Sequence, residues 1–339
     1  MKKKLALITG VSGQDGSYLA DFLLKKNYNV VGADRRSSRS DMWRLKRLGI
    51  NNKIILEELE LSETYEITRL LKKYKFDEIY NLAAQSFVKS SFNSPISTSD
   101  INGLGVLRIL EAIRELNPKT KFYQASSSEM FGKVLEKKQN ERTPFNPRSP
   151  YATAKLFGHF ITKNYRESYS LYAVSGILFN HESPLRGEEF VTRKITKGIT
   201  RIINGDLNCL ELGNLYSKRD WGYAKEYVVA IWKMLQMKKP NDYVISTGET
   251  KTVKDFIDEA IKYANIDANW IGAGLNERLV DKNKKTLIRI NPKYFRPAEV
   301  DLLVGDSKRA NKILKWYPKI KFKELVKIMM EDELKYYKN

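Results

Sequence analysis

Two side chains near the middle of the chain have the types and the spacing that proton transfer requires. Tyr151 and Lys155 stand four residues apart in the stretch SPYATAK, so a helix would place them on one face. A tyrosine whose pKa is about 10 is a poor base at neutral pH, and we expect the adjacent ammonium group to lower that pKa. The pair therefore predicts a tyrosine that exchanges a proton with a bound molecule.

A third candidate, Glu129, follows a run of serines in the stretch QASSSEMFG. The residues before the run are typical of a buried strand, and the serines fall where that strand would end. Capping of the strand end would explain one of the three hydroxyls. Glu129 is then either a solvated loop acid or a base placed beside a reacting carbon, and this stretch alone favours the loop.

The stretch TGVSGQDG places Gly10, Gly13 and Gly16 between a predicted strand and a predicted helix. Glycines at this spacing allow a tight turn and a close approach of the backbone to a diphosphate, which then lies at the helix N-terminus. Because the turn follows the first strand and opens an apolar-faced helix, it favours a dinucleotide-binding site over a purely structural turn.

The residues after the second predicted strand give conflicting indications of which dinucleotide binds. Asp34 lies 18 residues after the last glycine of the turn, where an acid would bind the ribose 2′-hydroxyl of NAD. Arg35 and Arg36 follow directly, together with Ser37 and Ser38, and these residues suit the 2′-phosphate of NADP. We predict NADP, with Asp34 turned outward, and NAD is the alternative.

Apolar runs that alternate with amphipathic segments organise the first half of the chain and would position these residues. Strands are predicted at 4–10, 29–34, 78–84, 121–127 and 171–180, with helical patterns at 17–27, 65–74, 102–116 and 151–169. Strands separated by helices imply right-handed crossovers and a parallel, doubly wound sheet of the Rossmann type.

The alternation weakens after about residue 185, where helical patterns rich in Lys and Arg follow. We predict an α/β protein with a Rossmann-type dinucleotide-binding domain over residues 1–185. A smaller, interleaved α/β substrate-binding domain is expected mainly over 186–339. Segments near 222–248 and 285–305 are expected to return to the first domain.

Composition excludes several classes of protein. The 42% of hydrophobic and 29% of charged residues suit a globular chain rather than a disordered one. One cysteine and two histidines leave no plausible His- or Cys-based metal site. The net charge of +20 comes from scattered lysines, which favours a solvated surface over nucleic-acid binding. With no signal peptide or apolar span in the sequence, we expect a cytoplasmic protein that does not enter a membrane.

The glycine turn, the hydroxyl-rich strand end and the Tyr–Lys pair together resemble the extended short-chain dehydrogenase/reductase superfamily. Within it, the chain is similar to the GDP-mannose 4,6-dehydratase family. The stretches FNHESPLRGEEFVTRK and KRDWG are far more specific than the glycine turn, and the matching stretches run from residue 5 to about 306. The family's usual Ser-Thr-Ser-Glu segment has Ser127 here in place of threonine, which keeps the hydroxyl.

The resemblance implies a role for many residues beyond the glycine turn. Cofactor contacts are implied at Gln14, Asp15, Arg35, Arg36, Ser37, Glu60 at the adenine, Leu82, Tyr151, Lys155 and His181 at the nicotinamide. Substrate contacts are implied at Ser86, Ser128, Asn180, Arg186, Arg193, Lys194, Arg219, Arg296 and Glu299. Of these, Arg193, Lys194 and Arg219 would neutralise the diphosphate of a GDP-sugar.

The resemblance also implies an internal redox cycle with Ser127, Glu129, Tyr151 and Lys155 as catalytic residues. Tyr151 would take the proton of the 4-hydroxyl while hydride leaves carbon 4 for NADP. Glu129 would remove the proton of carbon 5 and help expel the 6-hydroxyl as water. Hydride would return to carbon 6, giving a 4-keto-6-deoxy sugar nucleotide for deoxysugar biosynthesis.

Three alternatives remain at this level. A GDP-manno-heptose 4,6-dehydratase would have nearly the same motifs. An epimerase or 4-keto reductase would share Tyr151 and Lys155 but would not need Glu129. A nucleic-acid-binding protein with an inactive Rossmann fold would explain the net charge of +20 but not the presence of Glu129, Tyr151 and Lys155 together. By resemblance, the stretch RRSSRSDMWRLKRLG is a surface that reaches a neighbouring subunit, so we expect a homodimer or homotetramer.

Overall fold

Seven short strands form one parallel sheet in this computed structural model, which describes residues 3–37, 42–295, 300 and 302–337. In sheet order the strands are β11 (Tyr243–Ile245), β6 (Ala173–Leu178), β5 (Lys121–Ser127), β4 (Glu78–Asn81), β1 (Leu5–Thr9), β2 (Asn29–Asp34) and β3 (Ile55–Glu58). Every neighbouring pair is parallel. The predicted Rossmann-type α/β class is therefore confirmed.

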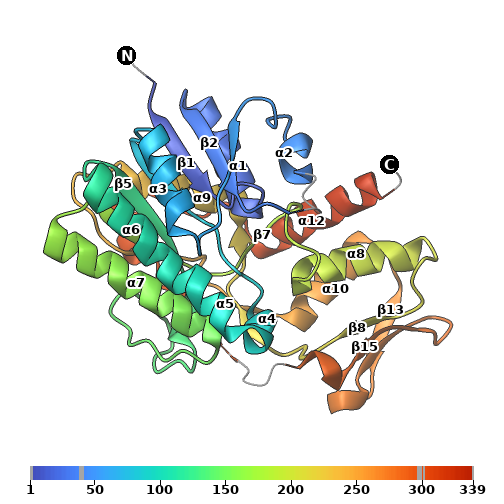
Figure 1. Cartoon of the computed structure of the whole chain (residues 1–339). Coiled ribbons are helices and arrows are strands. Elements are labelled where there is room, and N and C mark those ends of the chain that lie inside the picture. Colours follow the sequence, from blue (N-terminus) through green and yellow to red (C-terminus); the bar gives the residue numbers. More distant parts are fainter. Residues whose placement is uncertain (1–2, 38–41, 296–299, 301, 338–339) are drawn as a thin grey trace.

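Helices cover both faces of this sheet (Figure 1). One face packs against α1 (Gln14–Lys25), α9 (Ala224–Leu235) and α11 (Lys308–Leu314), and the other against α3 (Thr64–Lys73), α6 (Gly105–Leu116) and α7 (Pro150–Tyr169). Because the strands are buried on both sides, they are continuous apolar runs rather than alternating ones. The short helices α2 (Trp43–Arg47), α4 (Val88–Asn93) and α5 (Pro95–Ser99) complete this part.

A second, smaller layer is built from the C-terminal part of the chain (Figure 1). Its mixed sheet has the order β13 (Ala268–Ile271), β14 (Arg278–Asp281), β15 (Thr286–Ile290) and β8 (Leu210–Leu212). The helices α8 (Val191–Ile203), α10 (Val253–Tyr263) and α12 (Phe322–Tyr336) share a separate apolar core with this sheet. Two short pairs join the layers: β7 (His181–Glu182) with β10 (Gly222–Tyr223), and β9 (Lys218–Arg219) with β12 (Lys251–Thr252).

The segments near 222–248 and 285–305 were both expected to belong to the domain of the large sheet, and the structure agrees only in part. Strand β11 and helix α9, both within 222–248, belong to the large sheet and its cover. The prediction for 285–305 is wrong at its start, because β15 pairs with β14 and β8 in the small sheet. Helix α11, which was assigned to the substrate-binding part, packs against the large sheet through Ala310 and Leu314.

Strand order reverses between β1 and β4, and this point positions the site. In doubly wound sheets the carboxyl ends of the strands on either side of such a reversal open into a crevice that binds ligands. The glycine turn follows β1, Leu82 follows β4, Glu129 follows β5, and Asn180 follows β6. All four segments therefore emerge at the same edge of the sheet.

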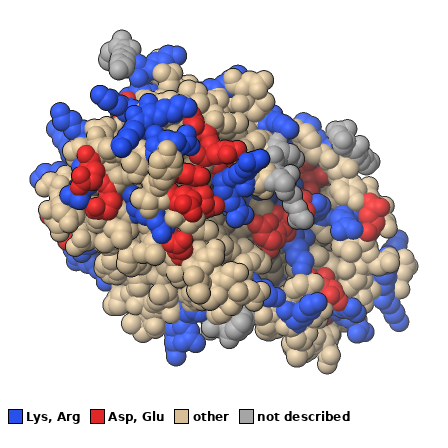
Figure 2. Space-filling view, viewed as in Figure 1, with Lys and Arg blue, Asp and Glu red and all other residues tan. Residues whose placement is uncertain are grey.

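Charge is distributed rather than gathered on the visible face of the molecule. Figure 2 shows Lys and Arg spread over this face with acidic side chains between them. Among the described helices, none has the length and apolar character that crossing a bilayer would require.

Candidate active site

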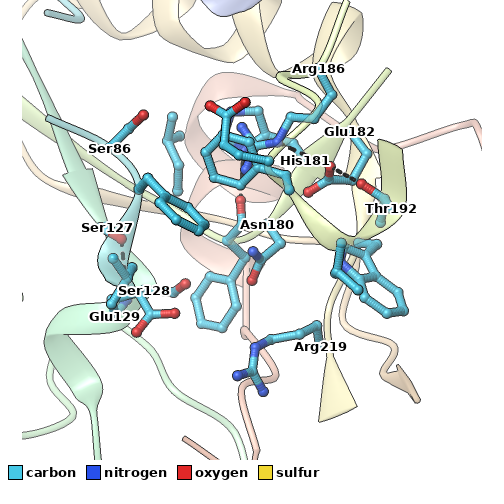
Figure 3. A pocket seen from close by; sticks show the side chains of 18 of the residues that line it. Ser86, Ser127, Ser128, Glu129, Asn180, His181, Glu182, Arg186, Thr192 and Arg219 are labelled. Carbon is cyan, nitrogen blue, oxygen red and sulfur yellow. Dashed lines mark hydrogen bonds and ion pairs between the residues drawn. The ribbon is translucent and has the colours of Figure 1, made fainter. Parts of the chain in front are cut away.

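A cleft of about 320 Å³ opens between the large sheet and the smaller layer, at the carboxyl ends of β4, β5 and β6. Thirteen of the residues predicted from the sequence line it: Asp15, Leu82, Ser86, Ser127, Ser128, Glu129, Tyr151, Lys155, Asn180, His181, Arg186, Lys194 and Arg219. Figure 3 shows Ser127, Ser128 and Glu129 on one side of the cleft, with Asn180 and His181 facing them. Residues 50 or more positions apart in the sequence thus meet in one cavity.

Glu129 is positioned by a short 3₁₀ turn, Ser128–Phe131, at the end of β5. The Ser127 hydroxyl caps this turn by accepting a hydrogen bond from the Glu129 backbone N–H at 3.2 Å. Only 8% of Glu129 is exposed, and the residue lines the cleft. The solvated-loop interpretation of Glu129 is therefore wrong.

Tyr151 and Lys155 lie in the first turns of α7, which begins with Pro150 after the capping hydroxyl of Ser149. The Lys155 ammonium group donates a hydrogen bond to the Ala125 carbonyl at 2.9 Å, and its nitrogen lies 6.0 Å from the centre of the Tyr151 ring. Burial lowers the pKa of Lys155 to about 8. The pair and Ser127 thus meet beside the strand end.

The expected lowering of the Tyr151 pKa by Lys155 is not observed. Burial raises the pKa of Tyr151 to about 12, and the hydrogen bond with the Ser127 hydroxyl offsets only part of that rise. The reason is that the buried phenol loses more hydration than its polar neighbours replace. The Ser127 hydroxyl thus contacts the Tyr151 phenol and the backbone N–H of Glu129.

The glycine turn has the shape of a diphosphate cradle. Gly10 has a φ of +70°, and a Cβ on it would lie 2.8 Å from the backbone of Ala83. A Cβ on Gly16 would lie 2.3 Å from the Gly10 carbonyl oxygen, so helix α1 packs too closely for any side chain there. Gly13 precedes α1 as its N-cap. The free N-terminal end of α1 and the close backbone fit a dinucleotide diphosphate.

His181 and Asp15 form a buried pair beside this turn. His181 donates from Nδ1 to the Phe179 carbonyl and from Nε2 to the Asp15 carboxylate, both at 2.7 Å. Burial alone would lower the pKa of His181, but the charge and hydrogen bond of Asp15 raise it above its ordinary value. Gln14 does not line the cleft, and its side-chain amide donates to Asp15 and to the His181 carbonyl.

A second cleft contains Arg35 and Glu60, together with Ser62 and Asp100. Arg36 and Ser37 are exposed and line neither cleft. The expectation that Asp34 turns outward is wrong, because its carboxylate accepts hydrogen bonds from the Ser12 hydroxyl and from the Ser12 backbone N–H at 3.1 Å. Asp34 therefore braces the glycine turn.

Three cationic side chains, Arg186, Lys194 and Arg219, line the main cleft. Arg219 is 6% exposed, and Lys194 lies with its ammonium nitrogen 3.8 Å from the centre of the Tyr294 ring. Arg186 lies over the Phe190 ring at 3.6 Å and pairs with the Glu182 carboxylate at 3.1 Å. These positive groups suit an anionic ligand.

The assignment of Arg193 to the substrate diphosphate is wrong. Its side chain is buried away from the cleft, where it forms an ion pair with Glu333 of α12 and donates to the Pro184 carbonyl. Arg193 therefore holds the segment before α8 against the C-terminal helix. Arg296 and Glu299 lie outside the described residues.

Several cleft residues were not singled out from the sequence. They are Lys89, Glu182, Glu189, Phe190, Thr192, Asn214, Ser217, Trp221 and Tyr294. Trp221 stands in the KRDWG stretch, which could have indicated it. Asn214 and Ser217 follow β8, a strand too short to stand out as a pattern.

Comparison with known proteins places the chain in one family. The family model of GDP-mannose 4,6 dehydratase matches residues 7–329. A GDP-mannose 4,6 dehydratase of Drosophila melanogaster is 50% identical over 342 residues, covering 98% of this chain and 87% of that protein. A GDP-mannose 4,6-dehydratase of Vibrio cholerae serotype O1 is 48% identical, covering 98% of this chain and 94% of that protein. A human GDP-mannose 4,6 dehydratase is 46% identical, covering 98% of this chain and 92% of that protein.

Solved structures give the same fold at low identity. A dTDP-glucose 4,6-dehydratase from Bacillus anthracis in complex with NAD has a TM-score of 0.82 at 20% identity, covering 99% of this chain and 98% of that one. RMD from Pseudomonas aeruginosa complexed with NADPH has a TM-score of 0.75 at 20% identity, covering 98% of this chain and 100% of that one. Fold, site motifs and near full-length similarity agree: the chain belongs to the GDP-mannose 4,6-dehydratase family.

Proposed function

We propose that this protein converts GDP-mannose to GDP-4-keto-6-deoxymannose by an internal redox cycle. The observation that carries the proposal is the presence of Glu129, Tyr151 and Lys155 in one cleft of a chain that belongs to this family. An epimerase or reductase needs the tyrosine and the lysine, but elimination of water also needs a group that removes the carbon 5 proton. We assign that step to Glu129, which lines the cleft.

Tyr151, Ser127 and Glu129 have separate tasks in this cycle. When bound, the nicotinamide cofactor supplies the hydride acceptor for carbon 4 and later the hydride donor for carbon 6. The Tyr151 phenol oxygen takes the proton of the 4-hydroxyl, with its orientation fixed by the Ser127 hydroxyl. The new ketone makes the carbon 5 proton acidic, and the Glu129 carboxylate removes it. Glu129 then gives this proton to the departing 6-hydroxyl, so that one water leaves. Tyr151 gives the proton that it took from the 4-hydroxyl to carbon 5 as hydride returns to carbon 6.

The raised pKa of Tyr151 makes a second group necessary. A phenol whose pKa is about 12 remains protonated at neutral pH, and it needs a positive charge close by to give up its proton. Lys155, whose nitrogen lies 6.0 Å from the centre of the Tyr151 ring, does not lower the pKa of Tyr151 in this structure, so we propose that it supplies that charge when bound ligands exclude water from the cleft and strengthen the interaction. Its hydrogen bond to the Ala125 carbonyl holds the ammonium group in place.

For the cofactor we propose NADP, with NAD as the alternative. The glycine turn, Gln14, Asp15, Leu82 and His181 would hold the diphosphate and nicotinamide parts. Arg35 and Glu60 face the second cleft, which suits the adenosine 2′-phosphate end, with Arg36 and Ser37 beside it. Two related structures were solved with NAD and NADPH, so the fold accepts both.

For the substrate we propose a division of the cleft. Ser86, Ser128 and Asn180 would contact the mannose, and Arg186, Lys194 and Arg219 the diphosphate, with Arg296 and Glu299 at the nucleoside. Residues 1–185 with 222–248 would form the cofactor domain, and the remainder of 186–339 apart from α11 would form the substrate domain.

We also propose a cytoplasmic homodimer or homotetramer. Exposed Phe157, Phe160 and Tyr169 on α7 support self-association, which light scattering would test.

Incubation of the purified protein with GDP-mannose, alone and in competition with GDP-manno-heptose, tests the proposed function. Mass spectrometry should detect loss of one water from GDP-mannose, with no net consumption of added NADP. Loss of water from the heptose alone would move the assignment to the sister enzyme. No loss of water from either sugar would refute the dehydratase proposal.

A further inference from the structure

Asp220 lies between β9 and β10 and is fully buried, with 0% of its surface exposed. Its carboxylate accepts four hydrogen bonds. Oδ1 accepts from the Thr247 backbone N–H at 2.8 Å and from the Thr247 hydroxyl at 2.6 Å. Oδ2 accepts from the backbone N–H groups of Gly248 at 2.8 Å and Gly305 at 3.3 Å. Both oxygens are thus satisfied by uncharged donors.

These four donors belong to two segments that are distant in sequence. Thr247 and Gly248 follow β11, the edge strand of the large sheet, and Gly305 forms an isolated parallel bridge with Gln139. The positive φ of Gly248, +79°, turns the loop so that its N–H faces Asp220. Burial raises the pKa of Asp220, and the Thr247 and Gly248 hydrogen bonds oppose that rise. Asp220 therefore ties three chain segments together at one point.

The two residues on either side of Asp220 face the cleft. Arg219 and Trp221 both line it and are 6% and 4% exposed. In an extended chain, alternate side chains point to opposite sides, so anchoring Asp220 in the interior directs both neighbours toward the ligand. Trp221 is held further by the rings of Phe256 and Phe322, at 5.6 and 6.1 Å between centres.

We propose that Asp220 is a positioning residue for nucleotide-sugar binding, which fixes Arg219 and Trp221 in the cleft without touching the ligand. This inference rests on the proposed function only for the identity of the ligand. Arg219 can pair with a diphosphate only if its backbone is held, because a displacement of about 1 Å is enough to lose a charge-assisted hydrogen bond. The buried Asp220 fixes the backbone of Arg219 from the side of the segment that faces away from the cleft.

Asp220→Asn is the first test. The asparagine oxygen keeps the two Thr247 bonds, but its NH₂ group faces the N–H groups of Gly248 and Gly305, so both of those bonds are lost. We expect KM for GDP-mannose to rise about tenfold while kcat stays within about twofold. Calorimetry with GDP alone should give the same loss of affinity. Asp242→Asn is the matched control, because this buried carboxylate binds Arg166 and the Ser175 N–H outside the cleft.

Asp242→Asn should lower stability and leave both KM and GDP affinity unchanged. Thr247→Val removes one donor and keeps the backbone bond, so it should fold even if Asp220→Asn does not, and should raise KM about twofold to threefold. The double variant Asp220→Asn/Arg219→Gln should bind GDP no more weakly than Arg219→Gln alone.

Unchanged GDP affinity in Asp220→Asn and in Thr247→Val would overturn the inference, as would additive losses in the double variant. Because GDP binding is measured without turnover, failure of the positioning role is distinguishable from failure of the dehydratase proposal. A wild-type protein that binds GDP but does not dehydrate GDP-mannose would refute the latter alone.

Discussion

Replacement of Lys155 by methionine should make the protein more stable and catalytically inactive. Lys155 is 4% exposed, and burial lowers its pKa from 10.5 to about 8. Because each pKa unit corresponds to about 1.4 kcal/mol, keeping the ammonium charge in this site costs roughly 3 kcal/mol of folding free energy at neutral pH. Methionine has a similar length and carries no charge, so it removes this cost.

The net gain is smaller, because the hydrogen bond from Lys155 to the Ala125 carbonyl is also lost. That bond contributes about 1 kcal/mol, and the Ala125 carbonyl keeps a second donor in the Gln124 side chain at 3.2 Å. Lys155→Met should therefore raise the free energy of unfolding by about 2 kcal/mol at pH 7.

The stability that Lys155→Met gains over wild type should decrease as the pH rises. Below pH 8 Lys155 is protonated in both the folded and the unfolded states, so the full cost is present. Between pH 8 and 10.5 the folded state has released the proton and the unfolded state still binds it, so wild-type stability rises with pH relative to the variant. The difference between the two proteins should shrink to near zero, or reverse, by pH 10.5.

Equilibrium urea unfolding at pH 7 and pH 10, without added nucleotide, measures both effects. Lys163→Met, on the exposed side of the same helix, is the control and should change stability by less than about 0.5 kcal/mol. A Lys155→Met protein that is less stable than wild type at pH 7, or a difference that does not shrink at high pH, would show that the buried ammonium group does not destabilise the fold.

Three further predictions concern single residues. Glu129→Gln should bind GDP-mannose with unchanged affinity and lose dehydration by about 10²- to 10⁴-fold at saturating substrate; full turnover would remove Glu129 from the mechanism. Arg193→Met leaves Glu333 buried without its cation, so thermal or urea unfolding should show a loss of about 3 kcal/mol while KM stays unchanged. A raised KM at normal stability would return Arg193 to the substrate site. Arg35→Ala should weaken NADP binding about tenfold or more and NAD binding little, measured by fluorescence titration; equal losses would contradict the NADP assignment.

The predicted positions that the structure reproduces are those that follow from local pattern. The glycine turn needs no tertiary information, because strand, turn and helix are adjacent in the sequence and the steric limit at Gly10 and Gly16 is local. Glu129 was assigned as a base through the resemblance to the family, because its own stretch favoured a loop. The end of β5 meets the ends of the neighbouring strands in the parallel sheet, which explains why Glu129 lines the cleft.

The residues predicted wrongly depend on contacts that pattern does not contain. Arg193 and Lys194 are adjacent in α8, so their side chains point about 100° apart and only one can face the cleft. The sequence of α8 does not show whether Arg193 or Lys194 faces the cleft. The ion-pair partner of Arg193 is Glu333, 140 positions later, so the local pattern does not contain this contact. Asp34 is held inward by Ser12, and the pKa of Tyr151 is decided by burial.

The fate of the hydrogen on carbon 4 of the substrate distinguishes an internal redox cycle from any other reaction of this protein. GDP-mannose that carries deuterium at carbon 4 should lose one water and give a product with that deuterium at carbon 6, because in an internal cycle the hydride taken from carbon 4 would return to carbon 6 within one turnover. Product without deuterium at carbon 6, or recovery of the sugar nucleotide with its water intact, would contradict the internal redox cycle built on Tyr151, Lys155 and Glu129.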